Sequence, residues 1–100
     1  MTRRLIIRRL AGVEIAYARK WYEAQCRGLG KEMSAAVMAK LREVAARPEQ
    51  FAVRYPPEIR HALVERFPYS IFFVIRPSFV AVIGVLHTSQ DAGARLRGRD

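Results

Sequence analysis

Apolar residues recur at helical spacing through two consecutive segments in the first half of the chain. The first segment covers residues 11–27, and the second ends at about Ala46, before Pro48. The apolar positions are Ile15, Ala18, Tyr22 and Cys26 in the first segment and Met33, Val37, Leu41 and Val44 in the second. Between the two segments lie Gly28 and Gly30, and glycine readily adopts the left-handed backbone that ends a helix. The pattern predicts two amphipathic helices that form an antiparallel hairpin.

The other hydrophobic runs alternate with a period of two or are rich in β-branched and aromatic residues. Residues 4–8 (RLIIR) predict a short first strand. Later strands are expected at residues 59–67, 69–76 and 79–87. The sequence RPSF joins the last two as a hairpin turn. Residues 48–58 contain three prolines and predict a connector, in which we expect Phe51 to anchor to the core.

This order of elements predicts an α+β fold, β-α-α-β-β-β, in which the helical hairpin packs on one face of a mostly antiparallel four-stranded sheet. In the last two strands, however, residues of both parities are apolar. In residues 69–76 these are Ile71, Phe73 and Ile75 on one face and Phe72 and Val74 on the other. One helical layer covers only one face of a sheet. The second face therefore needs either a partner chain or a strongly curved sheet that buries both faces itself.

Length and composition narrow the class of protein. One hundred residues support one domain, which we place at residues 1–91, followed by a basic C-terminal tail at residues 92–100. The formal net charge of +9 favours polyanions or acidic proteins as partners, although an arginine-rich surface that serves only solubility fits it too. Cys26 is the only cysteine, so we expect no disulfide, no metal site and no cofactor. The first apolar run is too short for a signal peptide or a membrane span, which indicates a cytoplasmic protein that does not bind membranes.

Three stretches of sequence carry a resemblance to a known family. They are EIAYARKWYEAQCRGLGKEM (residues 14–33), IRHALVERFPYSIFFVI (residues 59–75) and VAVIGVLHTSQD (residues 80–91). With them, nearly the whole chain resembles the RelE/ParE superfamily of bacterial toxins, and the last two stretches look more like the ParE-type plasmid-stabilisation branch. The chain departs from the family around Arg9 and Leu10, where a polar helix-capping residue is usual, and at Pro77 and Ser78, where acidic turn residues are common.

The resemblance implies the toxin of a type II toxin–antitoxin pair, held inactive by a small cognate antitoxin that wraps around it. ParE-like members poison DNA gyrase, whereas RelE-like members cut messenger RNA on the ribosome. The tail after Asp91 offers arginines but neither an aromatic residue nor a histidine for RNA cleavage. We therefore expect a gyrase inhibitor that is not an enzyme. The alternatives are a metal-independent, ribosome-dependent endoribonuclease and a basic nucleic-acid-binding module without toxicity.

A nuclease of this kind would need a base, an acid and cations around the reacting phosphate. His87 is the natural acid or base, and Tyr69 can orient a base or donate a proton. Arg60 and Arg66 are six residues apart on one expected strand, which would place both cations on the same face. Each residue also has a structural interpretation. His87 can be hydrogen-bonded in the turn that follows it, and the arginines can be solvated or can pair with the antitoxin.

Two further predictions concern aromatic residues and the second histidine. Trp21 and Tyr22 are expected to pack the helix hairpin against the sheet and not to stack on bases. His61 has the opposite parity from Arg60 and is therefore expected on the opposite face of the sheet.

Overall fold

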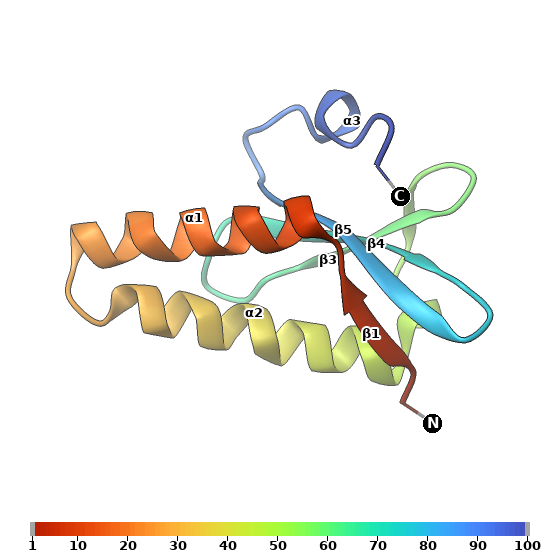
Figure 1. The fold of residues 1–100 in the computed structure, drawn as a ribbon, viewed down its shortest axis with the longest axis horizontal. Coiled ribbons are helices and arrows are strands. Elements are labelled where there is room, and N and C mark those ends of the chain that lie inside the picture. The colour runs from red at the N-terminus through yellow and green to blue at the C-terminus, as the bar shows by residue number, and fades with distance from the viewer. Residues whose placement is uncertain (1, 100) are drawn as a thin grey trace.

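The computed structural model describes residues 2–99, which form an α+β domain (Figure 1). A helix hairpin follows the first strand, and the other strands come after it. In chain order the elements are β1 (Arg4–Ile7), α1 (Arg9–Gln25), α2 (Leu29–Ala46), the 3₁₀ turn η1 (Pro48–Gln50), β2 (Val53–Tyr55), β3 (Ile59–Leu63), β4 (Tyr69–Ile75), β5 (Phe79–His87) and α3 (Ala92–Arg95). The predicted fold class and the helix hairpin are confirmed.

The strands form a single sheet in the order β1-β5-β4-β3-β2. β1 runs parallel to β5, and the other neighbours are antiparallel. The sheet has five strands and not the four expected, because Val53 in the proline-rich connector pairs with Arg60 of β3. Strand β3 is shorter than predicted and ends at Leu63. Both differences concern β2 and β3, the two strands at one edge of the sheet.

The main core lies between the helix hairpin and the sheet. The predicted stripe of α2 is confirmed, because Met33, Val37, Leu41 and Val44 are all at most 1% exposed. In α1, Ala18 is buried as expected, whereas Cys26 is exposed because the helix ends at Gln25. Phe51 anchors the connector as predicted, with its ring edge-to-face against Phe73 at 5.9 Å between centroids. Such a pair adds to the apolar burial that holds the connector.

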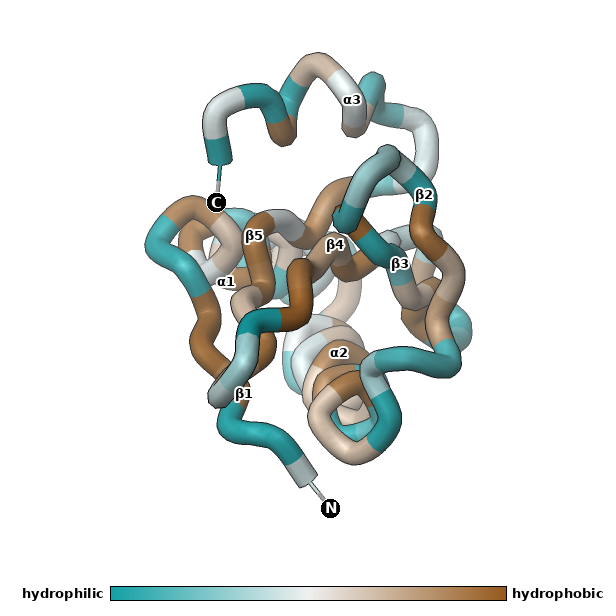
Figure 2. The backbone as a smooth tube through the Cα atoms, turned by 90° about the vertical axis from the view of Figure 1, so that its right-hand side faces the viewer, coloured by the Kyte–Doolittle hydropathy of each residue, from teal (hydrophilic) through white to brown (hydrophobic). Residues whose placement is uncertain are grey.

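The second face of the sheet is covered by the chain's own C-terminal segment. Figure 2 shows α3 on the opposite side of the sheet from α2. Ala92 and Leu96 are 8% and 3% exposed, and they pack with buried residues of β4 and β5, while Tyr55 of β2 completes the cluster. The prediction that this face needs a partner chain is therefore wrong, because the chain buries both faces of the sheet itself. The residues expected as a tail fold back onto the sheet because they bring apolar side chains to it.

The turn between α1 and α2 is held by a single carboxylate. Gly28 has a φ of 89°, which confirms the left-handed conformation predicted for a glycine at the end of the helix. Glu23 accepts hydrogen bonds from the backbone N–H groups of Gly28, at 3.0 and 3.1 Å, and of Gly30, at 3.0 Å. These donors, with the charge of Arg19, hold the pKa of the Glu23 carboxyl below its usual range. The start of α1 has no such side chain, and the N-cap residue Arg8 makes no capping hydrogen bond.

Among the described residues, no helix is both long enough and apolar enough to span a membrane.

Candidate functional site

An open groove of about 600 Å³ lies between α1, the adjacent ends of β4 and β5, and the C-terminal segment. Its apolar wall comes mainly from α1, and its polar side chains come from α1, from the ends of β4 and β5, and from the residues that follow β5. The side chains on which its chemistry depends are Glu14, Trp21, Tyr69, His87, Gln90 and Arg95. The groove is thus built from segments that are distant in the sequence.

The α1 wall of the groove continues into a stripe of exposed apolar side chains. Leu10, Val13, Tyr17 and Trp21 are 41%, 52%, 73% and 50% exposed, and their spacing puts them on one face of the helix. The prediction that Trp21 packs the hairpin against the sheet is therefore wrong. For Tyr22 it is confirmed, since its ring packs edge-to-face on Phe67 at 5.0 Å between centroids. Large apolar side chains gathered on one exposed helix face are typical of an interaction surface.

His87 and Tyr69 lie side by side at the edge of the groove. They are register partners on β5 and β4, and their ring centroids are 5.3 Å apart. The Nδ1 atom of His87 accepts a hydrogen bond from the backbone N–H of Ser89 at 3.0 Å and lies 2.8 Å from the Ser89 hydroxyl. In the neutral ring the proton therefore resides on Nε2. This is the geometry of a histidine that holds a turn, and it leaves Nε2 as the atom that can exchange a proton.

The neighbouring tyrosine is a proton donor and not a base. Burial raises the pKa of the Tyr69 hydroxyl, and the nearby Tyr22 and Tyr17 add to the effect. Tyr69 thus stays protonated at neutral pH. Together, Tyr69 and His87 supply two groups that can donate hydrogen bonds at one end of the groove.

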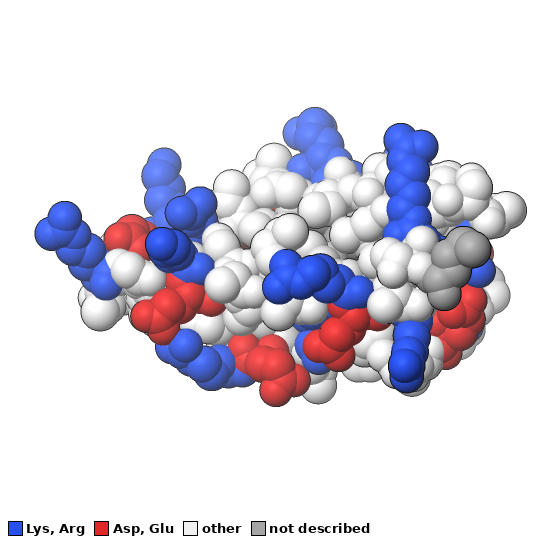
Figure 3. Space-filling model, turned by 90° about the horizontal axis from the view of Figure 1, so that it is seen from below, with Lys and Arg blue, Asp and Glu red and all other residues white. Residues whose placement is uncertain are grey.

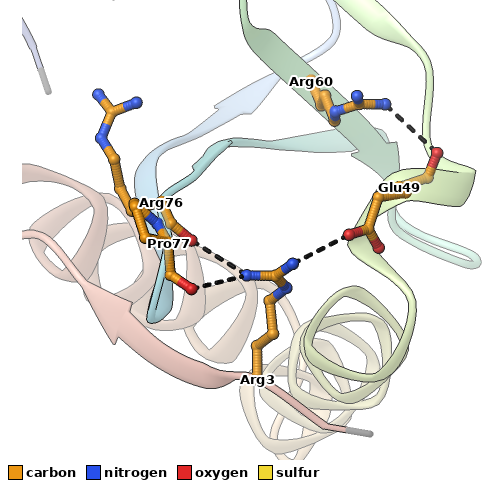
Figure 4. A network of polar contacts seen from close by, with 5 residues as sticks. All are labelled: Arg3, Glu49, Arg60, Arg76 and Pro77. Carbon is orange, nitrogen blue, oxygen red and sulfur yellow. Dashed lines mark hydrogen bonds and ion pairs between the residues drawn. The ribbon is translucent and has the colours of Figure 1, made fainter.

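The two arginines predicted to work with His87 lie elsewhere. Arg60 donates to the backbone carbonyl groups of Glu49, at 3.3 Å, and Phe51, at 2.6 Å, so it holds the connector (Figure 4). The same figure shows Arg3, which binds the Glu49 carboxylate at 3.1 Å. Arg60 faces Phe73 on β4, four residues from Tyr69, which corresponds to about 13 Å along a strand.

Arg66 does not share a strand face with Arg60, and that prediction is wrong because β3 ends before it. Arg66 lies in the turn before β4 with a φ of 73°, pairs with Glu32 at 2.8 Å and stacks over the Phe67 ring at 4.9 Å. His61, as predicted, is on the other face of the sheet from Arg60, where its ring stacks on Phe72. Of the four candidate residues, only His87 and Tyr69 come together.

The side chains that define the ends of the groove were not predicted from the sequence. Glu14 and Arg95 were not singled out, and the stripe from Leu10 to Trp21 was overlooked because a second apolar stripe occupies the same helix. Its spacing of three, four and four residues was a usable signal. Nothing local marks Glu14 or Arg95, because their positions depend on the C-terminal segment.

Charge is unevenly distributed over the surface. On the side where α2 lies, acidic and basic side chains alternate (Figure 3). Ion pairs on that side include Lys40 with Glu43 at 3.2 Å and with Glu65 at 3.4 Å. The groove is different, since Glu14, its acidic residue, is neutralised by Arg99 at 2.8 Å, which leaves Arg95 as a cation at its rim. No cluster of three or more metal-ligating side chains is found within residues 2–99.

Comparison with known proteins establishes the fold. No family model matches the sequence, and no curated protein matches it. A solved structure described as the chromosomal ParDE TA system from P. aeruginosa contains a chain that superimposes on this one with a TM-score of 0.76. The match covers 86% of this chain and 96% of that chain, at 16% sequence identity. The two chains share the α+β fold over almost their whole length, and at this identity the likeness concerns the fold.

Proposed function

We propose that this chain is a toxin of the RelE/ParE superfamily, that it belongs to a type II toxin–antitoxin pair in the cytoplasm, and that it inhibits DNA gyrase. The observation that carries the proposal is the shared fold with a chain of a ParDE toxin–antitoxin system over 86% of this chain. The sequence itself resembles the same superfamily over nearly the whole chain.

The groove supports a role for an antitoxin. Its α1 wall exposes Val13, Tyr17 and Trp21, and its rim holds Arg95, which pairs with no acid among residues 2–99. An amphipathic segment of acidic character would cover the apolar stripe and place a carboxylate near Arg95. A second copy of this chain suits the surface less well, because two molecules of net charge +9 repel each other.

The distribution of the candidate residues favours a target other than RNA. Cleavage would need an acid, a base and cations within hydrogen-bond reach of one phosphate. His87 and Tyr69 are neighbours, but Arg60 binds the connector and Arg66 pairs with Glu32, so Arg95 is the one cation in the described lining of their groove. A toxin that acts by binding a protein needs no such cluster, and this is why we favour gyrase.

The target is tested by producing the protein from an inducible promoter in bacteria and by assaying the purified protein. We expect growth arrest, inhibition of gyrase supercoiling and intact messages in a translation-dependent cleavage assay. His87→Ala and Arg60→Ala variants should inhibit gyrase as the parent does. Cuts positioned at codons that vanish in the His87→Ala variant would show an endoribonuclease instead. Harmless expression with salt-dependent binding to naked DNA or RNA would show a nucleic-acid-binding module.

The antitoxin site is tested with two matched substitutions of exposed apolar residues. The neutralising partner is the product of a short reading frame beside the gene, co-expressed with the toxin. Trp21→Ala should weaken the complex, because it removes the largest side chain of the α1 stripe. Leu63→Ala is the control, since Leu63 is 57% exposed on β3, outside the groove. Equal affinities for the two variants, measured by calorimetry, would place the antitoxin elsewhere.

A further inference from the structure

The C-terminal segment closes a gap that the sheet itself leaves open. Strand β1 pairs with β5 only as far as Val82, where the N–H of Arg8 makes the last backbone contact at 2.9 Å. The chain then turns into α1. From Ile83 onward, the outer edge of β5 has no neighbouring strand in the described part of the chain. Its backbone groups must find other partners, because buried N–H and C=O groups are costly to leave unpaired.

Side chains take the place of the missing strand. Glu14 of α1 accepts a hydrogen bond from the N–H of Val85 at 3.0 Å. Arg99 donates to the carbonyl of Ile83 at 3.2 Å and binds Glu14 at 2.8 Å. Gln90 accepts from the N–H of His87 at 2.8 Å. The open edge of β5 is thus sealed by one residue of α1 and by two residues that follow the sheet.

The ion pair at the centre of this arrangement is well shielded. The side chains of Glu14 and Arg99 are 19% and 14% exposed. This is far more buried than the pair between Arg66 and Glu32, whose side chains are 62% and 54% exposed. A shielded, bidentate arginine–carboxylate pair fixes geometry in a way that an exposed pair does not.

The same segment is anchored at two further points. Leu96 is 3% exposed and occupies the space above Gly84, where an added Cβ would lie 2.7 Å from its Cδ2 atom. Asp91 caps α3 by accepting a hydrogen bond from the N–H of Ala94 at 3.2 Å. Gln90, directly before Asp91, and Arg95, directly before Leu96, line the groove. The segment that covers the second face of the sheet therefore also forms part of the groove.

We propose that residues 90–99 form a strap that closes one end of the groove, and that the Glu14–Arg99 pair is its latch. When the latch holds, Gln90 and Arg95 are fixed at the rim and the edge of β5 is sealed. When it opens, the rim residues leave the groove and the Ile83 carbonyl loses its donor. The hydrogen bond from Val85 to Glu14 then loses the Arg99 side chain that binds the same carboxylate oxygen. Glu14 and Arg99 are positioning residues, and they act on a partner through Arg95. This inference rests on the proposed function in one respect, because it takes the groove as the binding site of the antitoxin.

The strap is tested first on the free protein. Trp21 is the only tryptophan and lies in the groove, so its quenching by acrylamide reports on how open the groove is. In Arg99→Ala, we expect increased quenching and exchange at the Val85 and Leu96 amides that is faster by about tenfold or more, whereas exchange in α2 stays unchanged. Arg97→Ala is the control, because it removes the same charge from an exposed residue that pairs with no described acid. It should behave as the parent.

Two outcomes would overturn the proposal. If the Leu96 amide exchanges faster in Arg99→Ala but Trp21 is quenched as in the parent, the segment is anchored by Arg99 without shaping the groove. If neither observable changes, the ion pair is no latch. Should Arg99→Ala raise exchange throughout the protein, Arg99→Lys replaces it, since lysine keeps the charge but loses the two-pronged contact. That variant should still open the strap selectively, and parental exchange at Val85 and Leu96 would refute the latch.

A second experiment tests the coupling between the strap and the partner's site, so that the strap and the proposed function can fail separately. With the co-expressed antitoxin, Arg95→Ala should weaken binding in the parent but have no further effect in the Arg99→Ala background, because Arg95 has already left the rim. Additive effects of the two substitutions would contradict the coupling. If the chain proves not to be a toxin, the quenching and exchange results still decide whether the strap exists.

Discussion

Gly30 is the position where one added carbon should do the most harm. An alanine Cβ at this residue would lie 2.5 Å from the backbone oxygen of Arg19 and 3.0 Å from the Glu23 Cβ. The Arg19 oxygen belongs to the middle of α1 and cannot rotate away, so the two helices must separate at the turn. Glu23 would then lose its hydrogen bond from the Gly30 N–H. The close approach, and not the backbone conformation, is what requires glycine here.

The expected size of the effect follows from two opposing terms. Overpacking of this kind costs about 1–3 kcal/mol. Replacing glycine by alanine in a helix returns at most about 1 kcal/mol, and less in the first turn, where Gly30 lies. The net destabilisation of Gly30→Ala should be about 1–2 kcal/mol. For a domain of this size, that lowers the melting temperature by roughly 5–15 °C.

Gly12→Ala is the matched control, because Gly12 is also helical and the nearest atom to its added Cβ is 3.9 Å away. This variant should be more stable than the parent by about 0.5–1 kcal/mol. Thermal and urea denaturation, followed by circular dichroism, measure both variants. A Gly30→Ala protein as stable as the parent would refute the argument from close approach. A loss of stability in both variants would show that helix propensity does not predict the effect of replacing a helical glycine by alanine in this protein.

Substitutions at three other positions test the turn, the strap and a residue with a left-handed backbone. Glu23→Gln should remove a pH dependence of stability. The lowered pKa of the Glu23 carboxyl gives stability that is fully present above the usual pKa of 4.5 and is lost as the pH falls through the lower pKa of the folded state. The melting temperatures of the parent and the variant should therefore converge on acidification. Leu96→Ala should cost about 2 kcal/mol in urea denaturation, because it empties a buried site on the sheet; no loss would mean that the strap does not pack in solution. Arg66→Gly should be more stable than Arg66→Ala by about 1 kcal/mol, because glycine adopts the left-handed backbone of this position without steric strain. Both changes remove the same ion pair with Glu32, so equal melting temperatures would exclude that strain.

Long hydrophobic patterns were predicted well from sequence, whereas short segments and contacts between distant segments were not. The bounds of β5 (Phe79–His87) and the buried stripe of α2 agree with the prediction because every position in them contributes to the same period. Strand β2 (Val53–Tyr55) was missed because three residues are too few to establish a period, and pairing with β3 decides their conformation. The end of β3 was missed for the same reason, which misplaced Arg66 on the strand face of Arg60.

The candidate site shows the same division. His87 and Tyr69 were both found from sequence, since each lies at the end of a strongly apolar strand, and the antiparallel register brings them together. The sequence also contained the exposed stripe of α1, but its spacing could not show which of two apolar faces the core would take. Burial of Ala18 and exposure of Tyr17 resolve that choice. The groove exists because the other face of α1 is committed to the core.

By itself, the sequence determined the order and type of the main elements, the buried face of α2 and the excess of positive charge. These properties follow from local periodicity and composition, which each segment carries without its neighbours. Only the tertiary structure decided that the C-terminal residues cover the sheet, that Arg60 and Arg66 lie away from His87, and that Glu14 forms an ion pair with Arg99. The two residues of that pair are 85 positions apart, so no local pattern records their contact. They meet because β5 leaves an unpaired edge, whose backbone groups need partners that the folded chain alone brings within reach.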